Sequence, residues 1–273
     1  MDNTKRLPAE LIEQARAYAE GEREPVTPRD AATVVLLRDG PRGVQAYLLR
    51  RHRGMAFAGG MYAFPGGGVD GRDEDAQIGW TGPPAEQWAR RLSCDEPLAR
   101  ALVCAAVRET FEEAGVLLAG PSPDTVVADT TGDDWEQERH ALVDRDLGFA
   151  EFLQQRGLLL RTDLLAAWAH WITPEFEPAR FDTRFFVAVL PQGQRTRDVS
   201  GEADAVAWMR PADAVAAVDD ASIRMLPPTY ATMREMATLR TPGEALEMAA
   251  ARDIRPIRPA VVFDAAGAYL TVG

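Results

Sequence analysis

The sequence is poor in residues that mark secreted, membrane-spanning and nucleic-acid-binding proteins. Cys94 and Cys104 are its only cysteines, so at most one disulfide could form, and we expect both to be reduced in a cytoplasmic protein. No apolar run reaches the roughly 18 residues that a membrane-spanning helix needs. Lys5 is the only lysine, and a formal net charge of −12 repels phosphate backbones and anionic lipid. We therefore expect neither a nucleic acid nor a membrane as partner.

What is present is typical of a folded globular protein, with 46% hydrophobic and 26% charged residues. β-rich runs at 31–37 and 44–50 flank turn residues and predict a hairpin, and a helical pattern covers 97–114. Strands and helices alternate further along, with a helical extension at about 222–255. Since there is no repeat and no long linker, we predict a single α/β or α+β domain over residues 1–273.

Two segments are expected to decorate this domain. Residues 8–20 predict a short amphipathic helix that begins at Pro8. Residues 70–96 are polar and contain Gly-Pro-Pro at 82–84, so we expect a surface excursion with one helical turn around 85–92. This insertion would either cap the functional site and select the ligand or form a dimer contact.

The helix at 97–114 carries three glutamates on one face. Glu109, Glu112 and Glu113 stand at positions i, i+3 and i+4, where like charges destabilise a helix unless a cation neutralises them. They also lie in its C-terminal half, where the helix dipole disfavours negative charge. Helix stability therefore does not explain them. A cluster of hard carboxylate oxygens suits Mg²⁺ or Mn²⁺, and the alternative is a solvated acidic surface.

The residues around these glutamates read Arg-Glu-Thr-Phe-Glu-Glu-Ala-Gly over 108–115. This string resembles the core of the Nudix box, which is the signature of hydrolases that cleave diphosphates linked to another moiety. The resemblance implies a mixed β-sheet sandwiched between helices, with helical insertions. It also implies that the Gly67 carbonyl and the carboxylates of Glu109, Glu112 and Glu113 bind the metal, while Arg108 holds the glutamates in orientation.

The chain departs from the common box in three places. The box glycine is available in Phe-Pro-Gly-Gly at 64–67, but a long insertion separates it from Arg108. Arg100 stands where the box has its first glutamate, and Thr110 replaces a bulky apolar residue. The long insertion, together with segments at 180–186 and 226–229, resembles a family branch that includes the peroxisomal coenzyme A diphosphatases of animals.

This resemblance makes coenzyme A or an acyl derivative the leading substrate. A nucleotide-sugar or dinucleotide diphosphatase, acting for example on ADP-ribose or NADH, is the alternative enzyme. A third possibility is a ligand sensor that keeps the fold without turnover, although a sensor has no reason to retain Glu109, Glu112 and Glu113. The resemblance also suggests a homodimer.

Two residues compete for the role of general base. Glu112 could deprotonate the attacking water while it contacts a metal. Glu202 lies six residues before Trp208 and resembles the additional acid that the family places ahead of a Trp-containing strand, with Asp204 as its nearest competitor. An ordinary loop acid is the other interpretation of Glu202. A carboxylate base needs no extreme pKa here, because metal-bound water ionises more easily than free water.

Arginines precede the glycine loop and could bind a polyphosphate. Arg50, Arg51 and Arg53 form a cationic cluster in an otherwise acidic protein, although the end of a solvated strand would look the same. The string at 60–67, Gly-Met-Tyr-Ala-Phe-Pro-Gly-Gly, is similar to half of a motif in coenzyme A diphosphatases. Arg53 is the nearest arginine upstream of it.

Overall fold

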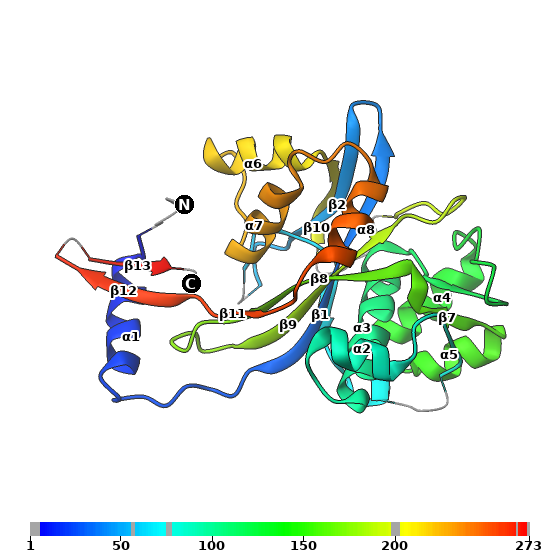
Figure 1. Cartoon of the computed structure of the whole chain (residues 1–273), viewed down its shortest axis with the longest axis horizontal. Helices are drawn as coiled ribbons and strands as arrows, with labels where there is room; N and C mark the ends of the chain where they lie inside the picture. The colour runs from blue at the N-terminus through cyan, green and yellow to red at the C-terminus, as the bar shows by residue number, and fades with distance from the viewer. Residues whose placement is uncertain (1–5, 56–57, 75–77, 198–202, 266, 272–273) are drawn as a thin grey trace.

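Eight strands of the described chain form one mixed sheet (Figure 1). The computed structural model describes residues 6–55, 58–74, 78–197, 203–265 and 267–271. The sheet order is β10-β2-β1-β9-β8-β11, with β3 paired to β2 and β4 to β1. The bounds are β1 (Arg29–Gly40), β2 (Gly43–Arg51), β3 (Tyr62–Ala63), β4 (Gly66–Gly68), β8 (Leu165–Ile172), β9 (Phe181–Val189), β10 (Ala203–Met209) and β11 (Pro256–Ile257). Strand β1 is antiparallel to β2, which confirms the predicted hairpin, and parallel to β9.

Helices cover both faces of this sheet. The side chains of a strand alternate between the two faces, and here both sets are apolar and need to be buried. Val34 and Leu36 of β1 belong to one apolar core, whereas Val35 and Leu37 belong to the other. The first core is completed by α2 (Ala85–Leu92), α3 (Glu96–Ala114), α4 (Asp133–Val143) and α5 (Phe149–Arg156). The second is completed by α6 (Pro211–Asp219), α7 (Pro227–Met236) and α8 (Pro242–Ala251). The predicted sheet between helices is confirmed.

Helix α3 has well-defined ends. Asp95 caps its N-terminus by accepting a hydrogen bond from the Leu98 amide, and Pro97 occupies its first turn. Gly115 ends it in the left-handed conformation, with φ of 69°, which glycine adopts without steric cost. The carboxylates in its last turns are therefore held at a fixed place relative to the sheet.

The expectation that residues 70–96 form a surface excursion is wrong. The segment contains the 3-10 turn η1 (Gly71–Glu74), β5 (Trp80–Thr81) and α2. Trp88 and Leu92 are buried in the first core, and the Trp88 ring meets Phe186 edge-on. Strand β5 joins a small sheet with β7 (Leu159–Arg161) and β6 (Ala119–Gly120). The helical turn expected at 85–92 is confirmed as α2, whose buried residues Trp88, Ala89 and Leu92 belong to the first core.

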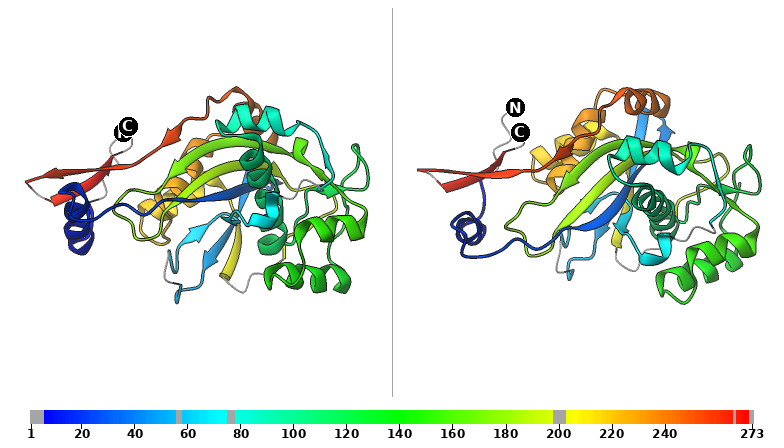
Figure 2. Two further views of the ribbon diagram at one scale, coloured as in Figure 1. Left: turned by 90° about the horizontal axis from the view of Figure 1, so that it is seen from below. Right: turned by 60° about the horizontal axis from the view of Figure 1, so that its bottom comes forward.

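Both ends of the described chain meet in an arm that projects from the sheet (Figures 1 and 2). It contains α1 (Ala9–Ala19), where a helix was predicted, and the hairpin β12 (Ala260–Asp264) with β13 (Gly267–Thr271), which was not predicted. The Leu7 amide donates to the Ala268 carbonyl at 2.8 Å. Among the described helices, none combines the length and apolar character needed to cross a membrane.

Candidate active site

The glycine loop lies flat on the sheet. Strand β4 pairs with β1, so that Gly66 faces Thr33 and Gly67 faces Ala32. A Cβ added to Gly66 would lie 2.7 Å from the Thr33 Cα, which leaves no room for a side chain. Glycine is therefore required at this position for the loop to approach β1 so closely.

The glutamates of α3 contact this loop directly. Glu113 accepts a hydrogen bond from the Gly66 amide at 2.8 Å. A Cβ on Gly67 would lie 2.6 Å from the carboxyl carbon of Glu109, so the absence of a side chain makes room for that carboxylate. The loop and the helix thus form one structural unit, although Gly67 and Arg108 are 41 positions apart in the sequence.

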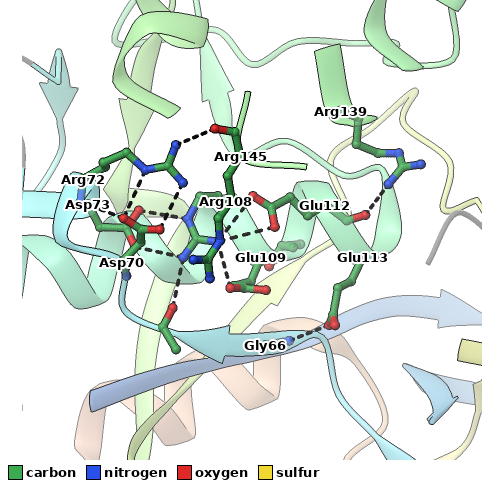
Figure 3. Close-up of polar contacts among 12 residues, drawn as sticks. Gly66, Asp70, Arg72, Asp73, Arg108, Glu109, Glu112, Glu113, Arg139 and Arg145 are labelled. Carbon is green, nitrogen blue, oxygen red and sulfur yellow. Dashed lines mark hydrogen bonds and ion pairs between the residues drawn. The ribbon is translucent and has the colours of Figure 1, made fainter. Parts of the chain in front are cut away.

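Arg108 connects the parts of this unit (Figure 3). Its Nη1 donates to Glu109 Oε1 at 2.8 Å and lies 3.3 Å from Glu112 Oε1. Its Nη2 donates to the Gly68 carbonyl at 3.1 Å. One guanidinium therefore sets the relative position of two carboxylates and the loop, as the rigid planar fork of arginine permits.

Asp73 is the residue that sequence reasoning missed. It lies in η1, is 1% exposed, and accepts from the Nε and Nη2 of Arg108, both at 2.9 Å. Arg100, at the position of the missing box glutamate, instead donates to the Ile78 carbonyl at 2.6 Å and lies over the Trp80 ring. The sequence did contain a signal for this residue. Arg108 lacks the glutamate that the box usually has, and a buried guanidinium then needs a carboxylate from elsewhere in the chain.

Burial controls the charge of the site. It raises the pKa of Glu109 to about 7, an effect that the charge of Glu112 reinforces and Arg108 opposes. Burial likewise raises the pKa of Glu112, again against the effect of Arg108. For Arg108, burial alone would lower the pKa, but its hydrogen bond to Asp73 and the surrounding carboxylates keep the pKa above its ordinary value. The cluster holds more negative charge than its arginine compensates.

These groups line a cavity of about 640 Å³. Apolar residues of β8, β9, the α7 region and the arm line the same cavity, among them Trp171, Ile172, Phe181, Phe185, Leu226, Pro227, Pro228 and Leu270. A ligand with both an anionic part and an uncharged part matches this lining.

The sequence and the fold of this chain match a known family. The model of the NUDT19 Nudix domain matches residues 28–236, which is most of the chain. The chain belongs to the Nudix family. A crystal structure of a NUDIX hydrolase from Alicyclobacillus acidocaldarius superposes with a TM-score of 0.70 at 27% identity, over 81% of this chain and 96% of that one.

Two curated relatives are also similar to this Nudix protein. An acyl-coenzyme A diphosphatase NUDT19 of Gallus gallus is 25% identical over 253 residues, covering 74% of this chain and 66% of that protein. The Xenopus laevis protein of the same name is 23% identical, covering 68% of this chain and 58% of that protein. The chain thus spans less than two thirds of the length of the curated relatives that it matches.

The Nudix box residues predicted from sequence lie together, but the other predicted residues do not all join them. Arg51 lines the cavity. Arg50 forms an ion pair of 2.5 Å with Asp204, and Arg53 is not among the cavity-lining residues. Glu202 lies outside the described residues. The candidate base from outside the box therefore stays a prediction.

The donor set of the Nudix box fits a hard divalent cation in its chemistry. Glu109 and Glu112 are largely buried carboxylates of raised pKa, and a cation would relieve the repulsion between them. As these side chains stand, no group of three or more acidic, histidine or cysteine side chains converges on one point within the described residues. The physical reason is that Glu109 and Glu112 both turn to Arg108, while Glu113 turns to Gly66.

Proposed function

We propose that this Nudix protein hydrolyses a diphosphate linked to another moiety. The observation that carries the proposal is the contact of Glu109 and Glu113 with the loop at Gly66 and Gly67, all four of which line one cavity. In the reaction, the oxygen of a water molecule attacks one phosphorus in line, and the bond from that phosphorus to the bridging oxygen breaks. The proton of the water passes to a carboxylate.

Mg²⁺ or Mn²⁺ would be held by Glu109, Glu112 and Glu113 together with the Gly67 carbonyl. The metal supplies Lewis-acid neutralisation of phosphate charge and makes a nearby water easier to ionise. Arg108 keeps Glu109 and Glu112 oriented, because it contacts both carboxylates and is itself held by Asp73. The water proton passes to Glu112 or Glu202.

Coenzyme A or an acyl-coenzyme A is the substrate that we propose. Such a molecule joins a diphosphate to a long uncharged chain, and the cavity is lined both by the carboxylates and by apolar side chains that include Trp171, Phe181 and Leu226. The curated relatives named as acyl-coenzyme A diphosphatases support the same choice. Hydrolysis would release phosphopantetheine, or its acyl derivative, and an adenosine bisphosphate.

A substrate panel with Mg²⁺ tests this proposal. Coenzyme A, a long-chain acyl-coenzyme A, ADP-ribose, NADH and nucleoside triphosphates are compared by product release, with E112Q as the inactive control. We expect the highest kcat/KM for coenzyme A or its acyl derivative. A clear preference for ADP-ribose or NADH would contradict the substrate, and no turnover of any compound would favour a ligand sensor.

We further propose that the protein acts as a homodimer in the cytoplasm. Light scattering at several protein concentrations tests the assembly, and fractionation of the source cells tests the compartment. A mass that stays at 29.9 kDa would contradict the dimer.

A further inference from the structure

Arg145 lies in the loop between α4 and α5 and lines the same cavity as the glutamates of α3. Its amide donates to the Leu142 carbonyl at 3.0 Å, and its carbonyl accepts from Arg72 Nη1 at 3.2 Å (Figure 3). Arg72 in turn donates to both carboxylate oxygens of Asp70, through Nε at 3.1 Å and Nη2 at 3.0 Å. The loop is therefore tied to the segment that contains η1.

The backbone of Arg145 has a φ of 64°. This left-handed conformation just past a helix is usually taken by glycine, because a Cβ makes it unfavourable. Here it is taken by a residue with one of the longest side chains, at the wall of the cavity. Strained backbone of this kind is concentrated at functional sites.

The charge of Arg145 is available to a ligand. Three other arginines that line the cavity are engaged: Arg108 with Asp73, Glu109 and Glu112, Arg72 with Asp70, and buried Arg139 with Glu136 and the Glu112 carbonyl. Arg145 is exposed and, although Asp144 and Asp146 flank it in sequence, it forms no ion pair within 4.0 Å with a described acid.

We propose that Arg145 binds a phosphate oxygen of the diphosphate substrate and that Arg72 positions the loop that carries it. This inference rests on the proposed function, since it assigns a contact to the same substrate. An anionic diphosphate entering a site rich in carboxylates needs a cation besides any metal, and a guanidinium presents paired donors that match phosphate oxygens. Arg145 takes no part in proton transfer.

Steady-state kinetics with coenzyme A and Mg²⁺ tests the proposal. We expect R145A to raise KM about tenfold with kcat within about threefold of wild type, which corresponds to about 1.4 kcal/mol of lost binding. R145K should recover part of the affinity, because it restores the charge without the fork. R72A should raise KM less than R145A does, because it only releases the loop. R23A removes an exposed arginine that does not line the cavity and should behave as wild type.

Calorimetric binding of coenzyme A and ADP-ribose without divalent metal separates this inference from the proposed function. Wild-type binding that R145A weakens at least fivefold supports the contact even if no compound is hydrolysed. If wild type turns over coenzyme A and R145A has the same KM, Arg145 has no such role while the proposed function stands. A melting temperature of R145A within about a degree of wild type excludes unfolding as the cause of any loss.

Discussion

At the scale of single residues, the site is a cluster of carboxylates whose negative charge exceeds the positive charge of Arg108. Arg108 contacts the carboxylates of Glu109, Glu112 and Asp73, so one positive charge faces three negative charges in a buried setting. The raised pKa values of Glu109 and Glu112 are the physical consequence, because burial and mutual repulsion disfavour the ionised forms. A divalent cation would remove that cost, which links the electrostatics of these residues to the proposed chemistry.

Replacing Glu112 with Gln should lower kcat by a factor of about 100 or more. The amide keeps the shape of the side chain but can neither hold a metal strongly nor accept the proton of the attacking water. The measurement is the rate of coenzyme A hydrolysis with Mg²⁺, alongside a melting curve to show that the fold is retained. Glu96→Gln, at the exposed other end of α3, is the matched control. Wild-type turnover in E112Q would rule out the role of Glu112.

The pKa of Glu109 predicts a pH-dependent stability. Its folded value of about 7 lies above the ordinary value of 4.5, so the folded state keeps a proton that the unfolded state has lost. Without divalent metal, the free energy of unfolding should therefore fall as pH rises from about 4.5 to 7 and level off above that.

Urea unfolding of wild type and E109Q at pH 5 and pH 8 measures this effect. The wild type should lose about 2 kcal/mol more than E109Q over this interval, since one pKa unit corresponds to about 1.4 kcal/mol. E109Q keeps Glu112, whose pKa is also raised, so some pH dependence should remain. Equal losses in the two proteins would show that Glu109 ionises normally.

At the scale of elements, the site depends on the joining of three segments. Helix α3 supplies the glutamates, β4 supplies the glycine backbone, and η1 of the insertion supplies Asp73. Asp73 of the insertion therefore supplies the carboxylate that the box has at the position occupied here by Arg100. Its buried ion pair also explains why η1 packs against α3 rather than extending into solvent.

Asp73→Asn should reduce both stability and activity. Loss of the carboxylate leaves Arg108 buried with less compensation, at a cost of about 3 kcal/mol, and releases the groups that Arg108 orients. Urea unfolding measures the change in stability, and kcat measures the change in activity. Arg108 affects kcat because it orients Glu109 and Glu112. Glu74→Gln, the exposed neighbour in the same turn, is the control that should change neither quantity by much. If D73N and E74Q unfold at the same urea concentration, the ion pair contributes little.

At the scale of the whole molecule, one sheet carries two apolar cores and one cavity. The cavity collects residues from the loop, α3, the region before α5, the strands β8 and β9, α7 and the arm. Most of these segments lie far apart in the sequence. A bound cation or substrate would therefore add contacts between parts of the chain that hydrogen bonds such as Gly66–Glu113 and Arg72–Arg145 already join.

Millimolar Mg²⁺ should raise the melting temperature of the wild type by several degrees. A ligand that binds only the folded state at a hundred times its dissociation constant stabilises it by about 2.7 kcal/mol. The shift should disappear in a double variant, E109Q with E112Q, and NaCl of equal ionic strength should not reproduce it. Thermal unfolding followed by circular dichroism provides the measurement. An equal shift in the double variant would place the cation elsewhere.

The sequence by itself determined the bounds of helix α3 and the helix face on which its glutamates lie. Asp95, Pro97 and Gly115 specify where α3 begins and ends, and the i, i+3, i+4 spacing places Glu109, Glu112 and Glu113 on one face of the helix. The β-rich runs and the turn residues between them likewise predicted the hairpin of β1 and β2, whose strands are apolar on both faces because helices cover both.

Only the tertiary structure decided which distant groups meet. Asp73 finds Arg108, Arg72 holds the Arg145 carbonyl, and the last strand joins the first residues of the described chain through contacts that no local pattern encodes. Spacing along a helix follows from the geometry of one backbone. The partner of a buried charge depends instead on how several segments pack, and on the energy of leaving that charge unpaired.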